Sequence, residues 1–142
     1  MFYMASTKIA PEKTAAEIQA LLGKHGAKQI LSEYENSEIV ALSFAIEVNY
    51  QRVPFRLPLR WEACLKAMKE EGRTPRSMCN AEQARRTAWR VLLRWVQAQL
   101  AMIDTQMVSM MEVMLPYAQM GELTLYEQLE QDHFKMLPDM SP

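Results

Sequence analysis

The sequence predicts an α+β fold: a small three-stranded antiparallel sheet packed by helices, with one long C-terminal helix and a short closing helix. Residues 28–59 alternate apolar and polar side chains in runs that are separated by turn residues. Residues 81–115 contain neither Gly nor Pro and are rich in helix formers. A chain of 142 residues suits one domain. We expect that domain over 14–137, between a flexible leader over 1–13 and a polar tail over 138–142.

The first element is a helix over about 14–24. Thr14 and Glu17 have the spacing of a capping box, in which each side chain accepts a hydrogen bond from a backbone N–H at the helix start. Gly26 is well placed for a left-handed cap after the helix. The helix therefore begins and ends on recognisable signals.

Three strands follow, over residues 28–34, 38–48 and 50–59. We expect turns at Asn36-Ser37 and near Asn49. The second strand places large apolar residues on one face and mostly small residues on the other. The third strand contains two prolines, which cannot donate ladder hydrogen bonds, so we expect it at an edge of the sheet.

A helix is predicted over about 60–71, and Gly72 ends it. Asn80 then caps the longest apolar-periodic stretch, with Gln83 as its reciprocal partner. A continuous helix over 81–115 would be about 52 Å long, which exceeds the width of a domain of this size. We expect either a break near 104–109 or a projecting helix that meets a partner.

The closing helix is predicted over roughly 125–133, with Thr124 and Glu127 as a second capping box. Before it, the second half of the long helix loses its polar stripe after Ala101 and is rich in Met. A helix that is apolar all round is a buried helix. The sequence therefore predicts a homo-oligomer, a dimer or a multiple of one, through this Met-rich half.

Several chemistries have little support in the residues. His25 and His133 are far apart in the sequence, and Cys64 and Cys79 do not form a CxxC motif, so no metal site or other cofactor is predicted. The four glycines form no nucleotide-binding motif, and no nucleophile has a clear catalytic base. We therefore favour a non-enzymatic protein.

Location and general charge are also constrained. No apolar run reaches the length of a membrane span, and the first residues lack the layout of a signal peptide, so the cytoplasm is the expected location. The formal net charge of −1 gives no overall attraction to nucleic acid, so such binding would need a local patch.

Arginines form the one local patch that suggests a ligand. They occur on the third strand, in the loop before the long helix and along one stripe of that helix, where Trp89 flanks them. Arginine suits phosphate, and interleaved aromatic residues suit stacking on bases. The alternative is a solvated face in which these arginines pair with glutamates and Trp89 is buried. The candidate phosphate or nucleic-acid-binding residues are Arg52, Arg56, Arg60, Arg73, Arg76, Arg86, Trp89, Arg90 and Arg94.

The chain also resembles a family of small proteins encoded by bacteriophages and prophages. The resemblance covers about residues 14–137 and rests on the segments AEIQALLGKHGAK, ALSFAIEV, VPFRLPLR, EQARRTAWRVLLRWVQAQLAMI, EVMLPYAQMG and TLYEQL. It implies a phage-encoded protein of the host cytosol and carries over no activity or catalytic residue. Such proteins serve genome replication and recombination, or neutralise host defences.

Two hypotheses lead from these observations. In the first, the arginine-rich face binds single-stranded nucleic acid or nucleotide phosphates. In the second, the chain is an anti-defence protein that inhibits a host immune protein or sequesters a nucleotide signal. An enzyme is the third and least supported class.

Overall fold

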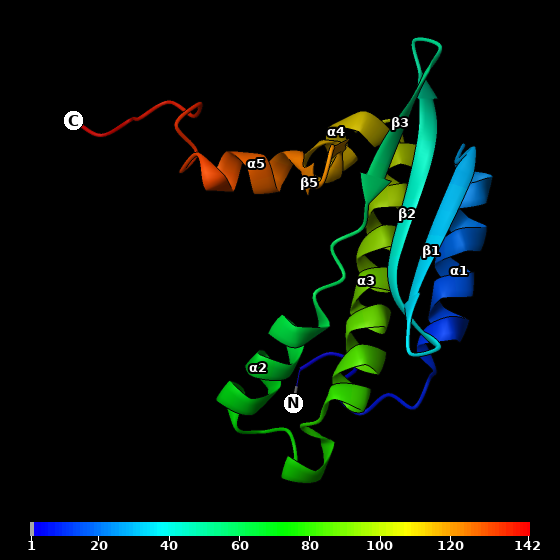
Figure 1. The fold of residues 1–142 in the computed structure, drawn as a ribbon, viewed down its shortest axis with the longest axis vertical. Helices are drawn as coiled ribbons and strands as arrows, with labels where there is room; N and C mark the ends of the chain where they lie inside the picture. The colour runs from blue at the N-terminus through cyan, green and yellow to red at the C-terminus, as the bar shows by residue number, and fades with distance from the viewer. Residues whose placement is uncertain (1) are drawn as a thin grey trace.

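The structure is a computed structural model that describes residues 2–142, and it confirms the α+β class (Figure 1). The first half of the chain forms a helix, a three-stranded meander and a second helix. These are α1 (Pro11–Lys24), β1 (Gln29–Glu35), β2 (Glu38–Val48), β3 (Gln51–Arg56) and α2 (Trp61–Glu71). The second half is mainly helical. It comprises the 3₁₀ turn η1 (Arg76–Met78), α3 (Ala81–Asp104), α4 (Met110–Met114), η2 (Leu115–Tyr117), the short strands β4 (Gln119–Met120) and β5 (Leu123–Thr124), and α5 (Leu125–Gln131).

The sheet has the order β1-β2-β3 and is antiparallel throughout. Both hairpin turns lie where the sequence predicts them, and their central residues have left-handed backbone angles, with φ of 50° at Asn36 and 50° at Asn49. Two central residues with positive φ match the right-handed twist of the flanking strands. The proline-containing β3 lies at an edge, as predicted.

The core lies between the sheet and two helices. Helices α1 and α3 cover one face of the sheet (Figure 1). Leu42 and Phe44 of β2 pack there with residues of both helices, including Ile18 and Trp89. The opposite face of the sheet carries no helix, and its central strand presents the small residues Ala41, Ser43 and Ala45.

The long helix breaks, which is one of the two outcomes that the sequence left open. Helix α3 ends at Asp104 after 24 residues, about 36 Å. Gln106 follows with a φ of 62°, and Ser109 then caps α4 in a capping box with Glu112. Because Met114 is buried and Met110 and Met111 pack against the core, the turn lets the chain bury its Met-rich residues on its own body.

Helix α1 differs from its prediction at its start. It begins at Pro11, its N-cap Ala10 provides no side-chain hydrogen bond, and Thr14 is fully buried inside the helix. The predicted capping box of Thr14 and Glu17 is therefore wrong. The second predicted box is confirmed: Thr124 and Glu127 cap α5 reciprocally.

The two ends of the chain behave differently. The leader predicted to be flexible lies against α3, where Ala5 is only 2% exposed. The C-terminal end instead projects from the body on the side away from α1 (Figure 1). It exposes Met136, Leu137 and Met140.

Candidate functional site

The predicted arginine face is not one surface. Arg52 belongs to the β2–β3 hairpin, whereas Arg73 and Arg76 belong to the loop before α3. Figure 1 shows this hairpin and this loop at opposite ends of the molecule. A ligand of nucleotide size cannot contact both groups at once.

Two of the three stripe arginines on α3 are held by other residues of the chain. Arg86 pairs with Glu82 at 2.7 Å and also donates to the Oε1 atom of Gln83. Arg90 pairs with Glu17 of α1 at 3.0 Å and donates to the hydroxyl of Thr14. Their side chains are 23% and 15% exposed. These contacts match the alternative in which the arginines are structural.

The arginines near β3 also have partners. Arg56 forms an ion pair with Glu33 of β1, so the two side chains meet across the central strand on the open face of the sheet. The guanidinium of Arg60 lies 5.7 Å from the centre of the Tyr126 ring of α5, a cation–π distance.

Trp89 is a correction to the predicted site. Its side chain is fully buried in the core, so it offers no surface for a base to stack on. Trp61, the other tryptophan interleaved with the arginines, lies under the guanidinium of Arg85 at 4.3 Å. Arg85 in turn pairs with Glu38 at 3.0 Å. The tryptophans interleaved with arginines in the sequence are thus used for contacts within the chain.

Four arginines remain exposed and form neither an ion pair nor a cation–π contact within residues 2–142. These are Arg52, Arg73, Arg76 and Arg94. Only Arg73 and Arg76 are close in the sequence. They are what remains of the predicted phosphate site.

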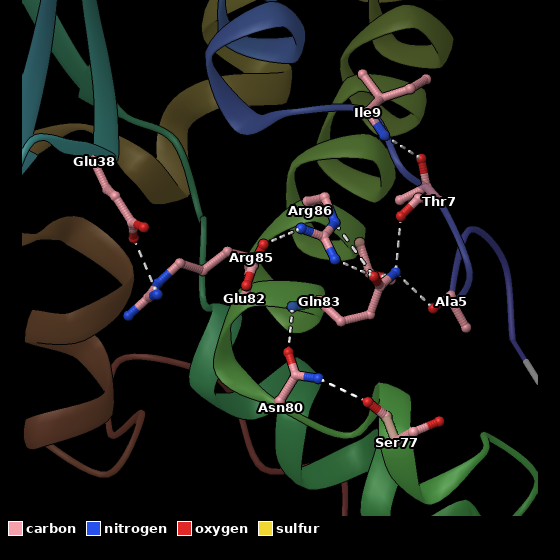
Figure 2. Close-up of polar contacts among 11 residues, drawn as sticks. Ala5, Thr7, Ile9, Glu38, Ser77, Asn80, Glu82, Gln83, Arg85 and Arg86 are labelled. Carbon is pink, nitrogen blue, oxygen red and sulfur yellow. Dashed lines mark hydrogen bonds and ion pairs between the residues drawn. The ribbon is translucent and has the colours of Figure 1, made fainter.

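The N-terminus of α3 is occupied by residues of the chain itself (Figure 2). The Oδ1 atom of Asn80 accepts from the Gln83 N–H at 2.8 Å, and its amide nitrogen donates to the Ser77 carbonyl. The Gln83 side chain, 4% exposed, donates to the carbonyls of Ala5 and Thr7. This buried amide holds the leader in place, a role that the sequence analysis did not foresee.

An apolar groove with a volume of about 580 Å³ lies between α2 and α3. One wall comes from α2 and the residues before it, and the other from α3. Phe2, near the N-terminus, and Tyr117 of η2 complete the groove. Its lining residues are Phe2, Pro58, Arg60, Cys64, Ala67, Ala88, Val91, Leu92, Trp95 and Tyr117.

The side chains that line this groove suit binding of a ligand better than catalysis. Arg60 is the one charged residue among the described lining residues. Burial raises the pKa of the Cys64 thiol, which disfavours the thiolate and therefore its reactivity. Val91 is 41% exposed although it lies on α3 among core residues. Trp95 is held edge-on against Tyr117, with ring centres 5.6 Å apart.

Residues 2–142 contain no group of three or more His, Cys, Asp or Glu side chains that could hold a metal ion. In the same part of the chain, no helix is long and apolar enough to cross a membrane. Comparison of the chain with protein-family models, curated proteins and solved structures finds no match. The resemblance to phage-encoded proteins therefore stays a prediction.

Proposed function

We propose that this chain is a non-enzymatic, protein-binding module whose groove between α2 and α3 takes an amphipathic helix of a partner protein. The observation that carries the proposal is the groove itself: about 580 Å³, lined by aliphatic and aromatic side chains, with a single cation. Binding sites of this kind are concave and largely apolar, with few polar groups that fix the orientation of the ligand.

The dimensions of the groove favour a helix of about two turns. The wall from α3 runs from Ala88 to Trp95, and the wall from α2 runs from Arg60 to Ala67. Each spans seven residue steps, about 10 Å. An amphipathic helix presents apolar residues at i, i+3, i+4 and i+7, which is the length of such a wall.

Arg60 gives the proposed partner a charge preference. Its side chain is exposed and lies beside the groove, close to the Tyr126 ring. A carboxylate at one end of the partner helix would meet this guanidinium in a partly apolar environment, where charge-assisted hydrogen bonds are strong. The proposed partner helix therefore carries an apolar stripe and an acidic residue at one end.

Peptide display tests the proposal without a known partner. A library of helical peptides is selected against the full chain, and the affinities of selected peptides are measured. Val91→Glu places a charge in the groove and should weaken binding at least about tenfold, or 1.4 kcal/mol. Gln97→Glu adds the same charge to an exposed position of α3 outside the groove lining and should have no effect. Failure to select any peptide, or equal binding to Val91→Glu, would overturn the proposal.

Phosphate or nucleic-acid binding is the second candidate, and the exposed pair Arg73 and Arg76 favours it. Both lie in one short loop and form no ion pair in the described chain. Such a site would contact phosphates and would show little sequence preference.

Three further expectations belong to this proposal. A host defence protein is the partner that the phage resemblance suggests. A cytoplasmic location agrees with the two free thiols of Cys64 and Cys79. A homo-oligomer through the Met-rich half would have only a small exposed apolar surface for its interface. That surface consists chiefly of Met102, Met107 and Leu115.

A further inference from the structure

Strand β1 forms an unprotected edge of the three-stranded sheet. Its only strand neighbour in the described chain is β2. Three of its seven residues are exposed apolar or aromatic side chains: Ile30 at 36%, Leu31 at 60% and Tyr34 at 59%. Exposed apolar edges are templates for pairing with another strand.

The other edge of the sheet, formed by β3, is protected against pairing with a further strand. Strand β3 contains Pro54, which has no N–H to donate, and Phe55 forms a β-bridge with Ala118. Prolines and covering segments are the usual means of blocking an edge. Strand β1 contains no proline, and no further strand pairs with its outer edge among residues 2–142.

The backbone of β1 is oriented for a further strand. Leu42 of β2 accepts a hydrogen bond from the Leu57 N–H at 3.0 Å, so its backbone groups point toward β3. Directions alternate along a strand, and Ala45 accordingly accepts from the Lys28 N–H on the β1 side. Gln29, Leu31 and Glu33, which lie opposite Ala45, Ser43 and Ala41, therefore face β2, and their neighbours along β1 face outward. The outward N–H and C=O groups belong to Ile30, Ser32 and Tyr34.

We propose that β1 pairs antiparallel with β1 of a second copy of this chain, centred on Ser32, to form a six-stranded sheet. This register uses the whole strand and places the outward backbone groups of the two copies opposite one another. It pairs Ile30 with Tyr34 of the second copy, twice by symmetry. Aromatic and β-branched pairs of this kind stabilise neighbouring strands.

Charge favours a second copy in this register. Glu33 lies opposite Leu31, and Glu35 lies opposite Gln29, so no glutamate faces another glutamate. A register shifted by one residue in each copy, centred on Glu33, would bring the two Glu33 side chains together and is disfavoured. None of the groove residues takes part, so this proposal stands apart from the proposed function.

Sedimentation equilibrium tests the pairing. The wild-type chain should dimerise reversibly at concentrations up to about 200 µM, because a single pair of strands makes a small interface. Tyr34→Lys should raise the dimer Kd at least about tenfold, since lysine on an edge strand opposes pairing. Tyr34→Phe keeps the ring and should leave the Kd unchanged. Circular dichroism of both variants confirms the fold.

Disulfide trapping tests the register itself, in a chain carrying Cys64→Ser and Cys79→Ser. Leu31→Cys combined with Glu33→Cys should give an intermolecular disulfide dimer on oxidation, because facing residues of a non-hydrogen-bonded pair lie about 4.5 Å apart. Met107→Cys should not. A wild-type monomer at all concentrations, equal dimerisation of Tyr34→Lys, or trapping only through Met107→Cys would overturn the proposal.

Discussion

Arg90 of α3 and Glu17 of α1 form an ion pair of 3.0 Å that joins the two helices covering the sheet. The same arginine donates to the Thr14 hydroxyl, and its Nε atom is buried without a partner in the described chain. A residue that looks like a phosphate ligand in the sequence thus fastens α1 to α3. Thr14 and Glu17, which look like a capping box, are its partners.

Arg90→Ala should lower the free energy of unfolding by about 1–3 kcal/mol, because it leaves a partly buried carboxylate without its charged partner. Arg94→Ala, on the same helix but exposed, should change it by less than about 0.5 kcal/mol. Urea denaturation followed by circular dichroism measures both. Equal effects of the two variants would contradict the structural role of Arg90.

Trp89→Ala should be severely destabilising, by about 3–5 kcal/mol, because it leaves a large cavity in the core. Trp61→Ala removes a partly exposed ring under Arg85 and should cost much less. Urea unfolding of the two variants checks the difference. A stable, well-folded Trp89→Ala chain would mean that the ring does not belong to the core.

Acid should loosen α5 through Glu127. The backbone N–H of Thr124, aided by its hydroxyl and by Arg60, holds the pKa of this carboxyl below its ordinary value of 4.5, against a smaller opposing effect of burial. A lowered pKa in the folded state stabilises the helix above the ordinary value, and this contribution is lost as the pH falls through the lowered pKa.

Cα chemical shifts of α5, followed between about pH 6 and pH 3, measure this loss. Glu127→Gln should remove most of the pH dependence, whereas Glu130→Gln, an exposed neighbour on the same helix, should leave it in place. Thr124→Ala should destabilise α5 by about 1 kcal/mol at neutral pH. If the pH response of α5 persisted in Glu127→Gln, a different titratable group would be responsible for it.

Binding of single-stranded DNA, where it occurs, should depend on Arg73 and Arg76. Replacing both with Gln should flatten the log–log salt dependence by about 1.4, or about 0.7 for each lost contact. Arg86→Gln should leave this slope unchanged, because its guanidinium is already paired with Glu82. Fluorescence anisotropy of a labelled oligo-dT over a salt series measures the slope for each variant. If Arg86→Gln changed the slope equally, the arginines along α3 would contact the DNA as well, and the prediction would be wrong.

The sheet is predictable from the sequence because its signals are local. Alternating side chains, the turn residues Asn36 and Asn49, and the prolines of the third strand lie within a few residues of what they specify. The predicted strand 38–48 coincides with β2. The break after α3 has a local signal as well, since Ser109 and Glu112 have the spacing of a capping box.

The site is not predictable in the same way, because it depends on which elements meet. A helical wheel shows that Arg86 and Arg90 share a stripe, but it does not show that α1 covers Arg90. The groove draws residues from the N-terminus, from two helices and from η2, so no spacing in the sequence marks it. On a helical wheel Val91 lies on the same side of α3 as core residues, and its exposure becomes visible only in the folded structure.

The indole N–H signals of Trp61, Trp89 and Trp95 test the central claim most directly. Trp95 lines the groove, Trp89 is buried in the core, and Trp61 lies under Arg85. In a ¹H–¹⁵N spectrum of the full chain titrated with a selected helical peptide, the Trp95 signal should shift in proportion to occupancy, while the other two stay in place. A titration that shifts the Trp61 signal and leaves Trp95 unchanged would contradict the groove as the binding site.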